Sequence, residues 1–209
     1  MLLYRRENTA RPERIMDALA FATEIATYVT TATGVAVSPW ATVYGGPLAS
    51  ISWTARVDSV AAMGAVGDQL LGDAKYLELV AGSSDLFSDG LQDHISELVA
   101  ATGTGEPTGE YATVINAQCA PGQIGAAMAW AVDMSNHSFS VTGLNVSLMR
   151  ELYGDFAHLT WITLADTREQ VDAARDALSA DPTYVERLDA AAGLFMPGSV
   201  ETRLVRRLG

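Results

Sequence analysis

Hydrophobic and polar residues alternate along this chain with two different periods. Apolar residues recur at helical spacing in some segments and at every second position in others, which predicts helices and strands respectively. In the first half the pattern predicts a strand, a helix, two strands of a hairpin, two further helical stretches and a last strand, over residues 2–7, 12–34, 35–44, 48–57, 59–72, 76–81 and 91–99. The second helix is expected to follow Asp58, whose carboxylate suits an N-cap.

The second half of the chain repeats the first. A shift of 108 residues aligns residues 51–90 with 159–198 without a gap, and a shift of 109 extends the match backward to Pro12 and Pro121. Identical pairs include Trp53 with Trp161, Asp73 with Asp181, Tyr76 with Tyr184 and Phe87 with Phe195. Aromatic residues that are identical in both halves are expected to maintain packing that each half needs.

Each half therefore has the order β-α-β-β-α-β, which is that of a ferredoxin-like unit. A four-stranded sheet with both helices on one face leaves its other face bare, and two such halves can cover each other. We predict an α+β fold of two tandem ferredoxin-like repeats, residues 1–102 and 110–209, packed sheet to sheet. The glycine-rich segment 103–109 is the expected linker.

A local pattern common to both halves carries a family resemblance. In each half a strand ends in Trp, a helix follows, and an Asp-x-x-Tyr element comes next: Ile51-Ser-Trp53 with Asp73-Ala-Lys-Tyr76, and Leu159-Thr-Trp161 with Asp181-Pro-Thr-Tyr184. The sequence resembles the dimeric α/β-barrel superfamily in tandem-duplicated form, and within it the NIPSNAP-like and antibiotic-biosynthesis-monooxygenase-like members. That resemblance implies an intramolecular barrel around a central cavity. The superfamily includes oxygenases, cyclases, isomerases, haem binders and plain binding proteins, so the resemblance leaves the function open among these classes.

Composition and charge narrow the choice of partner. The net charge is −12, and residues 15–149 hold only Arg56 and Lys75 as cations, which argues against nucleic acid. A single cysteine, Cys119, excludes an internal disulfide. No apolar run is long enough for a membrane span, and the charged N-terminus does not fit a signal peptide, so we expect a cytoplasmic protein. A monomer (pseudo-dimer) or a homodimer that binds a small molecule is the expected form.

Strand alternation separates the residues that face the helices from those that face the predicted cavity. Apolar side chains are assigned to the helix face, so their neighbours line the cavity. The expected substrate-binding residues are Trp40, Tyr44, Ser50, Ser52, His94, Asn145, Met149, Tyr153, Thr160 and Arg203. Aromatic groups with few polar ones suit an apolar ligand, aromatic or polyketide-like.

Two residues break the repeat on this cavity side. Glu151 and His158 stand where the first half has Thr42 and Ser50. A two-residue turn at Gly154 would set the carboxylate opposite the imidazole, with their Cβ atoms about 5 Å apart. His158 is then a candidate general base and Glu151 the group that orients it. The alternative is an ordinary cross-strand ion pair.

The family resemblance, together with Glu151 and His158, implies a cofactor-independent enzyme, monooxygenase-like or cyclase-like, that acts by proton abstraction, oxygenation or cyclisation on an apolar small molecule. The alternative is a non-catalytic binding protein or a structural pseudo-dimer. No metal is expected, because His94 with Glu97 lacks a third ligand nearby. Asn116 and Trp161 resemble residues of related barrels that degrade haem, but that activity also uses a His on the helix after the Trp strand, and this chain has none there.

Overall fold

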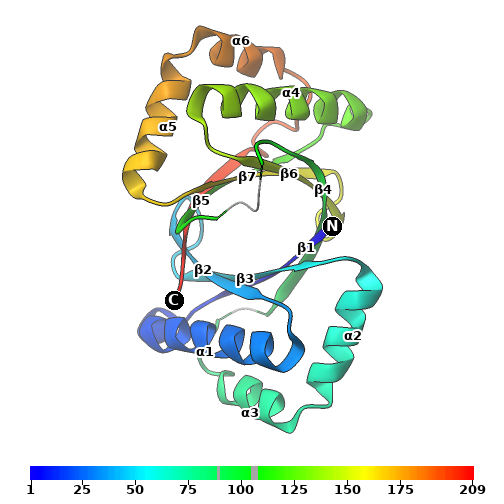
Figure 1. Ribbon diagram of the computed structural model, residues 1–209, viewed down its shortest axis with the longest axis vertical. Coiled ribbons are helices and arrows are strands. Elements are labelled where there is room, and N and C mark those ends of the chain that lie inside the picture. Colours follow the sequence, from blue (N-terminus) through cyan, green and yellow to red (C-terminus); the bar gives the residue numbers. More distant parts are fainter. Residues whose placement is uncertain (89, 105–107) are drawn as a thin grey trace. The chain divides into compact units, whose positions relative to one another are not determined.

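The computed structural model describes residues 1–88, 90–104 and 108–209 and contains strands and helices in the predicted order (Figure 1). The first half comprises β1 (Leu2–Thr9), a 3-10 turn (Pro12–Arg14), α1 (Ile15–Thr33), β2 (Val37–Tyr44), β3 (Ser50–Val57), α2 (Val60–Leu71), α3 (Ala74–Gly82) and β4 (Gln92–Ala101). The second half comprises β5 (Tyr111–Gln118), α4 (Ile124–Thr142), β6 (Val146–Tyr153), β7 (His158–Ala165), α5 (Arg168–Ala180), α6 (Pro182–Ala190) and β8 (Glu201–Arg207).

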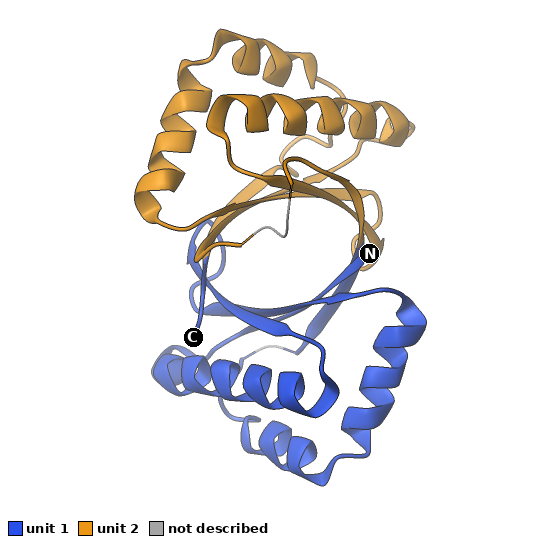
Figure 2. Ribbon diagram, viewed as in Figure 1, with its two compact units in different colours: residues 1–96, 206–209 blue, residues 97–205 orange. Residues whose placement is uncertain are grey.

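The hydrogen-bonded order of the strands, β1-β3-β2-β8-β5-β7-β6-β4, is that of a closed eight-stranded barrel, so the predicted fold class is confirmed. The chain divides into two compact units, residues 1–96 with 206–209 and residues 97–205 (Figure 2). We call them unit 1 and unit 2. Residues 105–107 of the predicted linker lie outside the described residues.

In unit 1, β3 pairs antiparallel with β1 on one side and β2 on the other, and three helices cover one face of these strands (Figure 1). Small residues of α1, Ala18 and Ala22, are fully buried and let the helix lie close to the sheet. Trp53 of β3 packs there, and its indole N–H donates a hydrogen bond to the carbonyl oxygen of Ala22 (3.0 Å). The helix face of the sheet therefore forms the core of this unit.

Unit 2 is built in the same way around β7, which pairs antiparallel with β5 and β6. Ala127 and Ala131 of α4 are fully buried against Leu148 and Leu159. The apolar alternate residues of β6 and β7 thus face the helices, as the sequence pattern predicts. Among the described residues, no helix is both long and apolar enough to cross a membrane.

Local side-chain hydrogen bonds determine where the shorter helices begin. The predicted cap of α2 is wrong by one residue: Ser59, not Asp58, accepts the N–H of Ala62 (3.0 Å), which is the spacing an N-cap needs. Asp73 caps α3 by accepting the N–H groups of Lys75 and Tyr76. Asp181 caps α6 in the equivalent way.

Each cap also contacts the long helix of its own unit. The Tyr28 hydroxyl of α1 donates to Asp73 (2.7 Å), and this bond is the main reason that the pKa of Asp73 is lowered. In unit 2 the corresponding residue of α4 is His137, whose Nε2 lies 3.5 Å from Asp181. His137 is therefore mostly buried beside a carboxylate, rather than on the solvated surface. A histidine thus stands beside the cap in unit 2 where unit 1 has a hydrogen-bonded tyrosine.

Burial of the helix-facing strand residues predicts the cost of removing them. Leu148 has no exposed surface, so Leu148→Ala should lower the free energy of unfolding by about 2–5 kcal/mol, through lost burial and the cavity left behind. Leu152 in the same strand is 39% exposed, and Leu152→Ala should cost less than about 0.5 kcal/mol. Urea unfolding followed by circular dichroism measures both. Both residues have the same parity in the strand, so equal losses would contradict the difference in burial between them.

Candidate binding site in unit 1

Unit 1 has a cavity of about 600 Å³, partly open to solvent, that is lined by the helix face of its sheet and by its three helices. The lining comes from β1, β2, β3, α1, α2 and α3 and from the segment that follows α3, and it is mostly apolar. This volume is within the range found for pockets that hold organic ligands. The candidate site therefore lies on the opposite face of the sheet from the one that the sequence analysis selected.

Strand register places a row of polar residues of β1 against this cavity. Directly paired residues of antiparallel strands point to the same face. Arg6 pairs with Trp53, Tyr4 with Ala55 and Asn8 with Ile51. Since Trp53 and Ile51 belong to the helix-side core, the three polar side chains share that side. All three line the cavity.

Arg6 forms a two-point ion pair with Asp93 of β4. Its Nε and one terminal nitrogen donate to the two carboxylate oxygens, each at 2.7 Å. The Tyr4 hydroxyl donates to the same carboxylate (2.9 Å). A guanidinium held by two parallel hydrogen bonds has a fixed orientation. The cluster therefore holds one cation in a defined place at the edge of an apolar cavity.

Burial and these contacts set the protonation states of the cluster. Burial, more than any other factor, raises the pKa of Tyr4 well above its usual value, so this hydroxyl stays protonated and donates. The hydrogen bond to Asp93 is the first cause of the raised pKa of Arg6. Burial alone would raise the pKa of Asp93, but the hydrogen bonds from Arg6 and Tyr4 and the charge of Arg6 outweigh it and lower that pKa. At neutral pH the group is Arg⁺, Asp⁻ and neutral Tyr.

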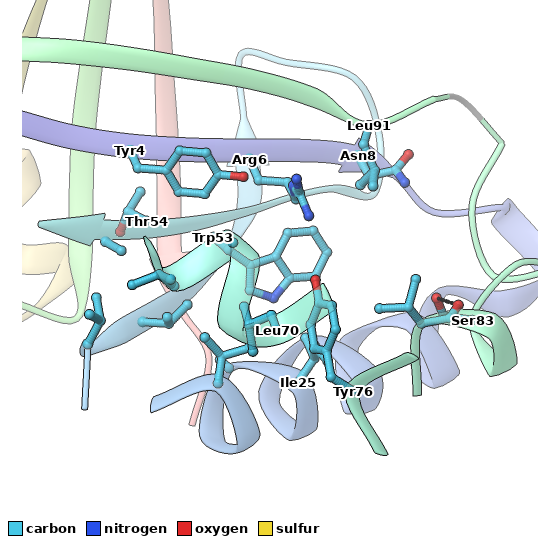
Figure 3. A pocket seen from close by; sticks show the side chains of 18 of the residues that line it. Tyr4, Arg6, Asn8, Ile25, Trp53, Thr54, Leu70, Tyr76, Ser83 and Leu91 are labelled. Carbon is cyan, nitrogen blue, oxygen red and sulfur yellow. Dashed lines mark hydrogen bonds between the residues drawn. The ribbon is translucent and has the colours of Figure 1, made fainter. Parts of the chain in front are cut away.

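Aromatic side chains form the inner wall of the cavity. Trp53 meets Phe87 edge to face with ring centroids 6.1 Å apart, and Phe21 meets the same Phe87 at 6.0 Å. In the view of Figure 3 the guanidinium of Arg6 and the hydroxyl of Tyr76 both point toward the indole of Trp53. A flat aromatic ligand beside Trp53 would thus have an apolar wall on one side and a cation at its edge.

None of the residues that the sequence analysis selected for the site lines this cavity. By strand parity, those on β2, β3, β6 and β7 occupy the opposite face of their sheets, and some make contacts there. Trp40 donates to Thr54 (3.0 Å) and lies under the guanidinium of Arg207, Ser50 donates to Glu7 (2.8 Å), and Thr160 donates to Asn116 (2.8 Å). Trp40, Ser50, His94 and Met149 are buried, Ser52, Asn145, Thr160 and Arg203 are partly exposed, and Tyr44 and Tyr153 are exposed. Their role as ligand contacts stays a prediction.

The pairing of β6 with β7 has the register on which the proposed catalytic pair depends. Arg150 pairs with Leu159, and one step further along the same register brings Glu151 opposite His158. The connection, however, comprises residues 154–157 instead of two residues, and Ala157 has a φ of 64°. The His158 N–H donates to the carbonyl oxygen of Asp155 (3.3 Å), and Nδ1 lies 3.2 Å from the same oxygen. Catalysis by this pair stays a prediction.

Asn116 and Trp161 lie on opposite faces of the sheet of unit 2. Asn116 pairs with Thr160, whereas Ile115 pairs with Trp161, so the amide lies on the opposite face from the indole. In unit 1 the arrangement differs, because Asn8 is buried on the same face as Trp53.

Tyr4, Arg6, Asn8 and Asp93 are not among the site residues predicted from the sequence. Both faces of β1 carry polar residues, so alternation along this strand does not indicate which face is buried. The available signal was the pairing of β1 with the strand that contains Trp53, which puts Arg6 beside that indole. Among the described residues, no group of three or more His, Cys, Asp or Glu side chains could hold a metal ion. The cavity itself suits an organic molecule.

Scans against protein-family models and curated proteins find no match for this chain. Solved structures do match it. A candidate monooxygenase of Fusobacterium nucleatum has a TM-score of 0.74 at 8% identity, covering 100% of this chain and 92% of that one. An anthrone oxidase-like protein has a TM-score of 0.69 at 13% identity, covering 100% and 93%. The chain has the dimeric α/β-barrel fold.

A candidate monooxygenase of Lactobacillus acidophilus is similar to this dimeric α/β-barrel chain to the same degree, with a TM-score of 0.69 at 8% identity, covering 100% of this chain and 94% of that one. The resemblance read from the two Trp-containing motifs is confirmed for the fold. Identities this low leave the chemistry to be argued from the site.

The Arg6–Asp93 pair predicts a pH dependence of stability. The pKa of Asp93 is lower in the folded chain than in the unfolded one, so its contribution is fully present above about pH 4 and is lost as pH falls through the folded pKa. At pH 7 the wild type should have a larger free energy of unfolding than Asp93→Asn. The difference should be smaller than for a fully buried ion pair, because the carboxylate is partly exposed. Urea unfolding at several pH values measures this difference, which should shrink below about pH 4. A difference that is constant or grows on acidification would contradict it.

Proposed function

We propose that unit 1 binds an apolar aromatic compound with an acidic hydroxyl or an enolisable ketone, and that the chain oxidises it with molecular oxygen without a cofactor. The observation that carries this proposal is the fixed guanidinium of Arg6 beside Trp53 in a largely apolar cavity. Fold neighbours named as monooxygenases and as anthrone oxidase-like support the reaction class.

Arg6 is the residue that would stabilise the reactive form of the ligand. A guanidinium has five N–H groups, and the pair with Asp93 uses two of them. The remaining donors can reach an oxygen atom of a ligand. A fixed cation beside a largely apolar wall favours an enolate or phenolate over its neutral form, because a nearby opposite charge stabilises the ionised group. Deprotonation of the ligand would therefore become easier on binding.

Asp93 and Tyr4 act as positioning residues in this proposal. The lowered pKa of Asp93 makes its carboxylate a weak base, so its main effect is to hold Arg6 in place. Tyr4 supports the same carboxylate through its hydroxyl. The proton of the ligand would leave to solvent water at the partly exposed edge near Asp93.

Anthrone is a suitable test substrate, because its ring system is flat and apolar and its methylene group is acidic through the ketone. Oxidation of that methylene group to a carbonyl consumes one O₂ and releases one water, so anthraquinone and water are the products. Carbon–hydrogen bonds are broken at the methylene carbon, one oxygen atom is added there, and the other oxygen atom leaves as water. Molecular oxygen is the only oxidant required.

Arg6→Gln should lower kcat/KM for anthrone oxidation by roughly 10²-fold, as removal of a single donor to a developing oxyanion does. Oxygen uptake and anthraquinone absorbance, measured with a chelator present, give the rates. Arg5→Gln is the matched control, since Arg5 is the neighbouring residue of β1, points to the opposite face and pairs with Glu7. Equal losses in both variants would attribute the effect to net charge and defeat the assignment.

The pair in unit 2 remains an alternative location for the base. If His158 takes the proton and Glu151 orients it, His158→Ala should lower the same rate by roughly 10²-fold, whereas a reaction confined to the unit 1 cavity should not need it. Binding of anthraquinone with no oxygen uptake by any form of the chain would favour the non-catalytic binding protein instead.

A further inference from the structure

We infer that each chain binds one ligand molecule, in unit 1, and that Trp130 fills the corresponding place in unit 2. The inference depends on the proposed function only for the class of ligand. It follows from comparing the two repeats residue by residue, each within its own unit.

Strand pairing defines which residues correspond. Arg6 lies opposite Trp53 in unit 1, and Ile115 lies opposite Trp161 in unit 2. By the same pairing, Tyr4 corresponds to Thr113 and Asn8 to Ala117. The second repeat therefore has no cation, phenol or amide at the positions that supply the polar groups of the unit 1 cavity. Ile115 instead packs against the core of its unit.

The helix that covers the sheet differs at one aromatic position. Phe21 and Trp130 each occupy the seventh position of a 19-residue helix, α1 and α4 respectively. Trp130 meets Trp161 edge to face with ring centroids 6.2 Å apart and meets Phe195 at 5.5 Å. Its indole N–H donates to the carbonyl oxygen of Arg187 in α6 (2.8 Å). The larger ring of Trp130 is thus held in place beside Trp161. The counterpart of Trp161 in unit 1, Trp53, lines the open cavity.

The difference between the cavity of unit 1 and the packed core of unit 2 affects the stability of the fold. An apolar cavity left unfilled reduces stability, by an amount that increases with its volume. Unit 2 replaces the polar positions with Ile115 and Ala117 and places an indole in the aromatic cluster, as a purely structural core would. Unit 1 keeps both the cavity and a fixed cation beside it. That combination is expected where a ligand supplies the missing contacts.

The anionic dye 8-anilinonaphthalene-1-sulfonate is the probe for this inference, because it fluoresces in apolar sites and carries a charge that complements Arg6. Fluorescence titration and calorimetry on the full chain should give one dye per chain. Phe21→Trp introduces the unit 2 residue into unit 1 and should weaken binding at least 10-fold. Trp130→Phe, the reciprocal change outside the proposed site, should leave dye affinity for unit 1 unchanged.

A second blocking variant covers the case in which Phe21→Trp does not fold. Gly67 of α2 lines the cavity, and a Cβ added there meets no atom within 4 Å, so Gly67→Leu should fold and project its side chain into the cavity. It should weaken dye binding as Phe21→Trp does. Circular dichroism and thermal melting check that each variant is folded.

Two dye molecules per wild-type chain would overturn the inference, and so would binding that survives both blocking variants or is lost in Trp130→Phe. Dye binding does not require oxidation. A single site that is blocked as predicted, in a chain that leaves anthrone unchanged, would therefore reject the proposed reaction and keep the inference. Two dye sites in a chain that oxidises anthrone would reject the inference of a single site and keep the proposed reaction.

Discussion

The pairing of β1 with β3 is the constraint on which the candidate site depends. This antiparallel register puts Arg6 directly opposite Trp53, so a cation and an indole occupy the same face of the sheet. A slip by one residue would bring Arg5 and Glu7 to the helix side and remove Arg6 from the cavity. Two fixed features prevent such a slip: the Trp53 indole is hydrogen-bonded to α1, and Arg6 is held by Asp93. The contacts that pack unit 1 therefore also fix the geometry of the site.

Duplication within one chain permits the two copies to take different roles. A fold built from two separate identical chains must have two identical sites, because any substitution appears in both. In this chain Phe21 and Trp130, or Arg6 and Ile115, can differ while both units keep the same helices and strand pairings. One unit can then be packed for stability and the other can retain a cavity. The residue of the long helix that lies beside the cap of the last helix also differs, being Tyr28 in unit 1 and His137 in unit 2.

The position of the cavity also explains its mixed chemistry. A pocket between a sheet and its helices is lined by side chains that would otherwise form a core, so it is apolar by default. Its charged group comes from β1, a strand whose helix-facing positions Tyr4, Arg6 and Asn8 are polar, while Tyr76 and Ser83 add hydroxyl groups from α3 and the segment after it. Asp93 comes from β4, far along the chain, and its carboxylate accepts two of the hydrogen bonds that the Arg6 guanidinium can donate. Without that partner a partly buried guanidinium would be unfavourable in this place.

Several features of the chain could be predicted from its sequence because they depend on local periodicity. Helical spacing from Ile15 to Thr33, alternation around Trp53, and the offset of 108 or 109 residues predict the elements, the repeat and the fold class. The faces of β6 and β7 follow from alternation as well. The sequence could not place the candidate site, because both faces of β1 are polar and because a cavity is a difference in packed volume, which no single segment records. Only the tertiary structure decided that Arg6 meets Asp93 beside Trp53, and that Trp130 packs against Trp161 in unit 2. These outcomes depend on contacts between residues far apart in the chain, and such contacts exist only after the strands and helices have packed.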